Sequence, residues 1–259
     1  MGLYRIRNFF ISQVQTYDRI EILLSQLSSN NLFEKVKAKR GLIKIIGVMA
    51  EVFQERLIDF LPRILQILIK KLKENDSQLY NALSESVEAL VIFVFPEIEV
   101  EVACDNIRNI LSQFFYLCGT GHSHTQTAAA MCVLKILQAI DPRCLSMLLK
   151  ETCTNIFKLL RHQSCKTHEI LFQAVLSVMF IYEGNPTKLQ ESIHILLPVI
   201  IDNMVHKDSN VRKIVVEVIF TIGQLIPEMI SPYRDCLLEK LNTCRYDQVD
   251  FDPLGVFYR

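Results

Sequence analysis

Prolines recur at nearly regular intervals along this chain of 259 residues, each just after a long apolar stretch. Pro96, Pro142, Pro186 and Pro227 follow the sequences FVF, AID, EGN and LI, and they lie 46, 44 and 41 residues apart. Since proline cannot extend a helix, each predicts the end of one helix and the start of the next element. A repeated unit of this length constrains the fold strongly, because each copy must bury its apolar face against its neighbours.

The clearest copy of the unit is residues 206–227, HKDSNVRKIVVEVIFTIGQLIP. Asp208 and Ser209 stand at its start, where their side-chain oxygens can accept hydrogen bonds from the N–H groups of a first helical turn. Apolar residues then recur every three or four positions, which keeps one broad stripe facing a neighbour. The stripe comprises Val211, Ile214, Val215, Val218, Ile219, Ile222, Leu225 and Ile226. A capped start followed by such a stripe is typical of the second helix of a HEAT-type repeat.

The repeat length of roughly 40–47 residues is that of HEAT and armadillo units, in which an A helix and a B helix are joined by a short turn. We therefore expect an all-α, HEAT/armadillo-type α-solenoid of about five to six helix pairs. The expected A helices cover 17–28, 55–74, 98–118, 143–162, 187–205 and 230–245, and the B helices cover 33–53, 77–95, 123–140, 166–182 and 209–226. Pro62 and Pro198 are expected to bend the A helices that contain them.

Outside the repeats, which span residues 17–249, we expect a lead-in helix over 1–16 and an apolar tail over 250–259. The tail is not helical in pattern, and its apolar residues can cover the last repeat or dock elsewhere. We favour a cap, because terminal repeats of a solenoid need a cover.

Charge and cysteine content narrow the class of protein. Lys plus Arg and Asp plus Glu both number 28, so the chain lacks the net positive charge typical of duplex nucleic-acid binders. Charge is uneven, however: residues 1–75 hold 13 basic and 7 acidic residues, whereas residues 76–110 hold 1 basic and 7 acidic. Eight cysteines without a C-x-x-C pair indicate an intracellular protein with free thiols rather than a disulfide framework. No segment has the roughly 18 uninterrupted apolar residues that would predict a membrane span, and no signal peptide is expected.

No pattern typical of an active site occurs in the sequence. A Gly-rich phosphate loop, G-x-S-x-G and H-E-x-x-H are all missing, so we expect a protein that is not an enzyme and needs no cofactor. Cys118, His122 and His124 place three potential zinc ligands within seven residues. We favour an ordinary Gly-containing turn with exposed histidines, because no fourth ligand is apparent.

The A-to-B turns are the other candidate site. Each turn taken alone is an ordinary helix cap with solvated polar side chains. Taken together on one edge of a solenoid, they would form a single extended surface that carries basic residues, among them Lys73, Lys207 and Lys213. Such a surface would favour an acidic partner.

Five segments, in order, resemble the N-terminal TOG-like HEAT domain of the TORTIFOLIA/SPIRAL family of microtubule-associated proteins. They are QILIKKLKENDS (66–77), TAAAMCVLKIL (127–137), CTNIFKLLRHQS (153–164), KDSNVRKIVVEVI (207–219) and LNTCRYDQV (241–249). The resemblance implies a TOG-like paddle in the cytoplasm, on microtubules or on those of a cilium or flagellum axoneme, which binds tubulin through its A-to-B turns. By position, the implied contacts are Asn30, Asn31, Phe33, Lys35, Lys37, Lys73, Asn75, Ser77, His122, His124, Ser164, Lys166, Lys207, Ser209, Asn210, Arg212 and Lys213.

The alternative is a HEAT-repeat adaptor, of a ciliary or nuclear-envelope type, that binds another protein through its helical surface. Two departures from the family pattern are compatible with binding to the microtubule lattice rather than to free tubulin, or with such a scaffold. The chain has no Trp in its turns, and after LNTCRYDQ it continues with VDFDPLGVFYR. Polar, basic turns would favour tubulin, and an exposed apolar groove would favour a peptide or helix partner.

Overall fold

The computed structural model describes residues 20–22, 24–25, 36–74, 76–162 and 167–243, and it divides the chain into two compact units, Met1–Cys144 and Leu145–Arg259. Within these residues the regular structure is entirely helical, without a strand, as predicted. The expected lead-in helix over 1–16 and the apolar tail over 250–259 lie outside the described residues.

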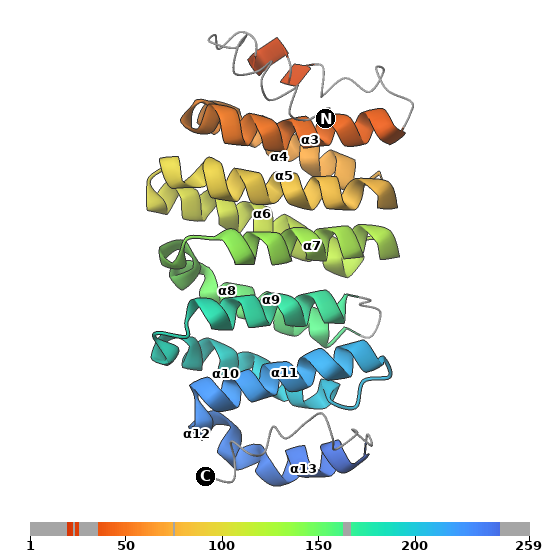
Figure 1. Ribbon diagram of the computed structural model, residues 1–259, viewed down its shortest axis with the longest axis vertical. Coiled ribbons are helices and arrows are strands. Elements are labelled where there is room, and N and C mark those ends of the chain that lie inside the picture. The colour runs from red at the N-terminus through yellow and green to blue at the C-terminus, as the bar shows by residue number, and fades with distance from the viewer. Residues whose placement is uncertain (1–19, 23, 26–35, 75, 163–166, 244–259) are drawn as a thin grey trace. The chain divides into compact units, whose positions relative to one another are not determined.

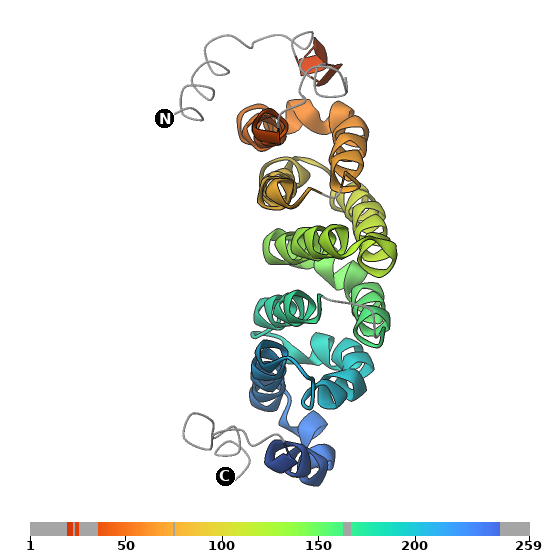
Figure 2. The same ribbon diagram turned by 90° about the vertical axis from the view of Figure 1, so that its right-hand side faces the viewer.

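The first unit consists of helices in two layers. Its elements are α3 (Val36–Phe53), η1 (Gln54–Phe60), α4 (Leu61–Leu72), η2 (Ser77–Leu79), α5 (Tyr80–Phe93), η3 (Phe95–Glu97), α6 (Val100–Thr120) and α7 (Ser123–Ala139). The B helices α3, α5 and α7 pack side by side in one layer, and the A helices α4 and α6 form the other (Figures 1 and 2).

The second unit repeats this arrangement. It contains most of α8 (Pro142–Leu160), followed by α9 (His168–Ile181), α10 (Pro186–Asn203), α11 (Ser209–Leu225), α12 (Pro227–Ile230), η4 (Ser231–Tyr233) and α13 (Arg234–Thr243). The B helices α9 and α11 pack on each other, and the A helices α8 and α10 form the second layer beside them (Figure 2).

Proline marks the start of elements as predicted. Pro142, Pro186 and Pro227 are the first residues of α8, α10 and α12, and Pro96 lies in the first turn of η3. This placement costs no hydrogen bond, because the first N–H groups of a helix have no partner within it. Pro198 lies inside α10, also as predicted.

Two A helices that were predicted to be continuous are each divided into shorter elements. Residues 55–74 do not form one helix bent at Pro62: η1 covers the first half, and Pro62 stands in the first turn of α4. The preceding Gln54 has φ 43°, a left-handed conformation that is uncommon for a residue other than glycine and that redirects the chain after α3. Residues 230–245 are likewise interrupted, because Pro232 lies in the first turn of η4 (Ser231–Tyr233) and α13 starts only at Arg234.

The core of α11 is wider than the predicted stripe. Val211, Val215, Val218, Ile219 and Ile222 are buried as expected, and Ile226 is buried just after the helix, whereas Ile214 and Leu225 are half-buried. Val216 and Thr221, which lie off the stripe, are buried as well. The reason is that α11 contacts α9, α10 and α12, so more than one side of it is covered.

Helix α5 is covered on two sides in the same way, since it packs against both α3 and α7. By length and composition alone, the stretch Ser77–Glu97 could cross a membrane, but 61% of its most apolar window is buried inside the protein. Its apolar character therefore matches the packing of a central core helix.

The cysteines described by the structure are all free thiols. Cys104, Cys118, Cys132, Cys144 and Cys153 are buried, and Cys236 is exposed. Burial raises the pKa of Cys132 and of Cys153 to about 12, because a thiolate would lose its hydration there.

Candidate functional site

The turn between α4 and α5 is tied to the start of α3 by one carboxylate. Glu74 accepts from Lys71 Nζ at 2.6 Å and from Lys39 Nζ at 2.9 Å, one lysine on each carboxylate oxygen. Burial alone would raise the pKa of Glu74, but the hydrogen bonds and charges of Lys71 and Lys39 outweigh it, so the pKa lies below its ordinary value. The positive charge of Lys39, close to the first predicted turn, is therefore partly neutralised by Glu74.

Two side chains of the same turn remain available to a partner. Asp76 begins η2 as its N-cap, accepting at Oδ1 from the backbone N–H of Gln78 at 3.0 Å. Lys73 and Ser77 are exposed on either side of this cap. The carboxylate thus fixes the backbone of the turn, and the lysine and the serine face solvent.

The turn between α6 and α7 depends on a glycine. A Cβ added at Gly121 would lie 2.7 Å from the carbonyl oxygen of Leu117 and 3.0 Å from Thr125 Cβ, too close for any other residue without movement of the backbone. His122, the N-cap residue of α7, is exposed, as is His124.

This turn lies beside the start of α5, because the rings of His124 and Tyr80 are 6.1 Å apart. Burial, followed by the charge of Asp76, raises the pKa of Tyr80, so this phenol stays neutral next to the turn. In the first unit, two contacts therefore join neighbouring helix starts at one end of the B layer. Lys39 of α3 contacts Glu74 in the turn before α5, and Tyr80 of α5 contacts His124 of α7.

The alternative reading of this turn as a zinc site is not supported by its geometry. Cys118 is buried beneath the turn, with its thiol directed to the carbonyl oxygen of Gln126 at 3.8 Å. His122 and His124 are exposed. Within the part of the chain that the structure describes, no three His, Cys, Asp or Glu side chains are arranged to hold a metal ion.

In the second unit, the turn between α10 and α11 is held by a network that the sequence reasoning missed. Arg212 was expected to face a partner, but its Nη1 donates to the carbonyl oxygens of His206 at 2.8 Å and Lys207 at 3.2 Å. Asp208 accepts at Oδ1 from the N–H of Asn210 at 2.9 Å, which confirms the predicted N-cap of α11. Arg212 is thus a clamp on the turn rather than a freely exposed cation.

His206 completes this network from the other side. Its Nδ1 accepts from the backbone N–H of Asp208 at 3.0 Å, and its ring lies 5.1 Å from that of His168 at the start of α9. His168 is buried, with Nε2 3.0 Å from the carbonyl oxygen of Leu160. Burial, followed by the charge of His168, lowers the pKa of His206, which favours the neutral ring that can accept at Nδ1.

The remaining predicted contacts of this turn are solvent-facing. Ser209 and Asn210 are exposed in the first turn of α11, and Lys207 and Lys213 are exposed beside them. The described turns therefore present hydroxyl, amide, imidazole and ammonium groups, which can form hydrogen bonds and ion pairs with an acidic surface.

Several predicted contacts cannot be placed. Lys37 lies in α3, of whose first side chains nothing is described, and the others fall outside the described residues: Asn30, Asn31, Phe33, Lys35, Asn75, Ser164 and Lys166. Whether any of the predicted contacts binds a partner stays a prediction.

Layers of paired helices joined by short polar turns define a HEAT/armadillo-type α-solenoid, the class that was predicted. Within that class, the chain belongs to the TORTIFOLIA1 N-terminal family, whose sequence model matches residues 8–251. This membership confirms the resemblance drawn from the five segments.

Two relatives from Arabidopsis thaliana illustrate the family. TORTIFOLIA1-like protein 4 is 22% identical over 240 residues, covering 92% of this chain and 36% of the relative. Microtubule-associated protein TORTIFOLIA1 is 22% identical over 245 residues, covering 92% of this chain and 27% of the relative. The chain thus spans about a third of the length of these relatives.

Solved structures agree on the fold. A designed armadillo repeat protein in complex with the peptide (KR)4 superposes with a TM-score of 0.59 at 15% identity, covering 91% of this chain and 97% of the designed protein. The MAST/Orbit N-terminal domain superposes with a TM-score of 0.54 at 13% identity, covering 89% of this chain and 97% of that domain.

Proposed function

We propose that this chain is a non-enzymatic microtubule-associated protein, or the corresponding domain of one, that acts on the cytoplasmic cytoskeleton. The observation that carries the proposal is the family match over residues 8–251, together with a relative named as a microtubule-associated protein. An α-solenoid suits the role, because it offers a long row of turns rather than a catalytic cleft.

We further propose that the A-to-B turns make the contact with tubulin or with the microtubule lattice. The support for this is the character of the described turns, which hold Lys73, Lys207 and Lys213 exposed on backbones fixed by side-chain caps. Fixed turns lose little conformational entropy on binding, and their ammonium groups are attracted to the acidic surface of tubulin.

Co-sedimentation with taxane-stabilised microtubules across a salt series tests the proposal. The native chain should pellet at low salt and be released as salt rises, because exposed charges are screened. Triple reversal of Lys73→Glu, Lys207→Glu and Lys213→Glu should weaken binding by about tenfold or more, taking roughly 0.5 kcal/mol or more for each exposed charge. Arg212 is left unchanged, because replacing it would also disrupt the turn.

A matched control carries the same change in net charge away from these turns. Arg56→Glu, Lys150→Glu and Lys188→Glu are exposed positions in η1, in the middle of α8 and at the start of α10. This variant should keep most of the binding. Absence of pelleting by the native chain at low salt, or equal losses in the two triple variants, would refute binding through the turns.

A further inference from the structure

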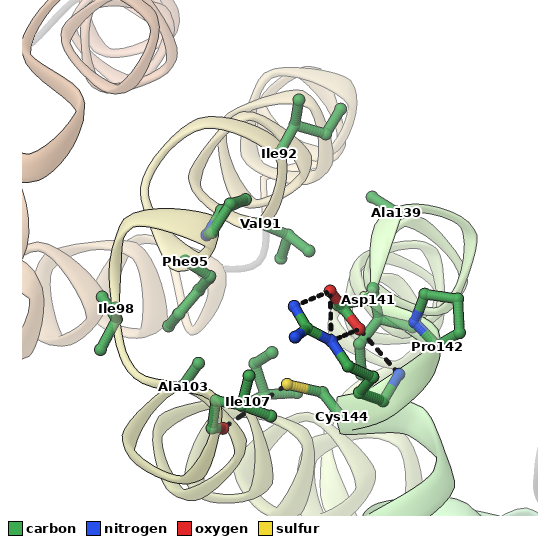
Figure 3. Close-up of a pocket in the computed structure, with 14 residues that line it drawn as sticks. Val91, Ile92, Phe95, Ile98, Ala103, Ile107, Ala139, Asp141, Pro142 and Cys144 are labelled. Atoms are coloured by element: carbon green, nitrogen blue, oxygen red, sulfur yellow. Dashed lines mark hydrogen bonds and ion pairs between the residues drawn. The ribbon is translucent and has the colours of Figure 1, made fainter.

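A cavity of about 310 Å³ opens in the first unit at the end opposite to the A-to-B turns (Figure 3). It lies where α5 and α7 end and where η3, α6 and the first turn of α8 begin. Its wall is mainly apolar and includes Val91, Ile92, Phe95, Ile107 and Ala139. Ile92 is 45% exposed, so apolar surface continues from the cavity to solvent.

One ion pair contributes the polar part of the wall. Arg143 Nε and Nη2 donate to Asp141 Oδ1 and Oδ2 at 3.1 and 3.0 Å, and the backbone N–H of Arg143 also donates to Oδ1 at 2.7 Å. The hydrogen bonds from Arg143 hold the pKa of Asp141 below its ordinary value, so both groups stay charged. Because the two charges of this pair cancel, the net charge around the cavity opening depends on other residues.

The segment that follows α5 carries a glutamate at every second position. Along residues 95–101, FPEIEVE, the residues Pro96, Ile98 and Val100 line the cavity, and the glutamates between them are exposed. Ile98 has φ −112° and ψ 149°, an extended conformation that joins η3 to α6. Glu97, Glu99 and Glu101 are exposed and next in the chain to residues that line the cavity. After the hydrogen bonds with Asp141, the charge of Glu101 helps to raise the pKa of Arg143 in the cavity wall.

These three glutamates also account for part of the acidic segment 76–110, for which the proposed function has no role. Three other acidic residues of the segment form ion pairs: Glu85 with Lys44, Glu88 with Lys135 and Asp105 with Arg108. Among the described residues, Glu97, Glu99 and Glu101 have no ion pair within 4.0 Å. Exposed carboxylates beside an apolar cavity are complementary to a ligand that combines an apolar group with positive charges.

We propose that this cavity is a docking site for a basic peptide segment of a partner protein, which inserts one bulky apolar side chain between flanking lysines or arginines. The apolar side chain would occupy the hollow between Val91, Phe95 and Ala139, and the cations would face Glu97, Glu99 and Glu101. The cavity is near the lower end of the range for ligand pockets, a size suited to one such anchor. The same glutamates would repel the acidic surface of tubulin, so this partner differs from the one proposed for the A-to-B turns.

Fluorescence anisotropy on the full chain tests the site with three labelled peptides. In the first, Leu-Phe is flanked by two lysines on each side; in the second, glutamates replace the lysines; in the third, Ser-Ser replaces Leu-Phe. Only the first peptide should bind well, because the second lacks the charge and the third lacks the anchor. Failure of the first peptide to bind at low salt, or equal binding of the serine peptide, would overturn the proposal.

Two variants locate the binding. Glu97→Gln, Glu99→Gln and Glu101→Gln together should weaken the first peptide about tenfold, as expected for three exposed charges. Ala139→Phe should fill the mouth and weaken it by a similar factor. Glu183→Gln, Glu217→Gln and Glu228→Gln, all exposed in the second unit, form the matched control and should leave affinity unchanged.

Two further measurements separate the possible outcomes. The triple glutamine variant changes only exposed side chains, so thermal melting should match that of the native chain, and unchanged peptide affinity in this variant would refute the site even if Ala139→Phe misfolds. The same variant should pellet with microtubules like the native chain. Loss of peptide binding with normal pelleting would thus support the site independently of the proposed function.

Discussion

Replacing Arg212 with alanine should destabilise the turn between α10 and α11. The change removes both hydrogen bonds from Nη1, to the carbonyl oxygens of His206 and Lys207. A hydrogen bond to a charged group contributes about 1.5–3 kcal/mol when it is shielded from water. Because Arg212 is only half-buried and water can replace part of the interaction, we take about 1 kcal/mol for each bond. The free energy of unfolding should therefore fall by about 2 kcal/mol.

Urea denaturation followed by far-ultraviolet circular dichroism measures this loss, since the chain has no Trp to serve as a fluorescent probe. With a urea dependence of about 2 kcal/mol per M, the midpoint should shift down by about 1 M. Arg212→Lys can keep one of the two bonds and should lose about half as much.

The neighbouring Lys213→Ala provides the control, because Lys213 is exposed and its removal should change stability by no more than about 0.5 kcal/mol. If Arg212→Ala were no more destabilising than Lys213→Ala, the clamp assigned to Arg212 would be wrong.

Three other substitutions have definite expected outcomes. Asp208→Ala removes the N-cap of α11 and should cost about 1 kcal/mol in a urea melt, whereas Asp208→Asn should retain most of the stability. Phe172→Ala empties a fully buried site in α9 and should cost about 3–5 kcal/mol, against less than about 0.5 kcal/mol for Phe180→Ala, whose side chain is 60% exposed. Because the pKa of His206 is lowered in the folded state, the unfolded chain binds a proton first as pH falls through the ordinary value of 6.5. Its contribution to the free energy of unfolding should therefore decrease below about pH 6.5 and level off below the folded pKa. His206→Asn, which keeps an acceptor near Nδ1, should remove this part of the pH dependence; an unchanged thermal-melting profile would contradict the assignment.

Much of the fold could be predicted because its signals are local. The N-cap at Asp208 and the proline at the start of α8, α10 and α12 act within one helical turn, so neighbouring residues suffice to recognise them. Packing against several neighbours could not be read in the same way. Val216 lies off the apolar stripe of α11, and its burial follows from contacts with other helices of the second unit.

The interrupted A helices show a second limit. A proline with an apolar stretch on both sides is compatible with the interior of a continuous helix, as for Pro198, or with the first turn of a new helix, as for Pro62. In the second case, the chain changes direction at Gln54, whose backbone is left-handed. Glutamine is not a residue type that predicts this conformation.

The candidate surface was predictable in position but not in detail. The sequence places polar residues in the turns, yet it does not reveal that Arg212 and Lys39 are engaged within the protein while Lys73 and Lys207 are exposed. The apolar cavity was missed entirely, because its wall brings together two stretches of sequence, 91–107 and 139–144, that meet only in the fold. The alternation of acidic and apolar residues over 95–101 was the local signal that could have pointed to it.

The buried free thiols can be used to measure local unfolding of the chain. An alkylating reagent should modify exposed Cys236 at once, whereas Cys132 and Cys153, with pKa values raised to about 12, must wait for their surroundings to open. Cys132 lies in the first unit and Cys153 in the second, so pulse alkylation read by mass spectrometry would time each unit separately. A binding partner that engages only one unit would then slow one cysteine and leave the other unchanged, and no dye or engineered probe would be needed.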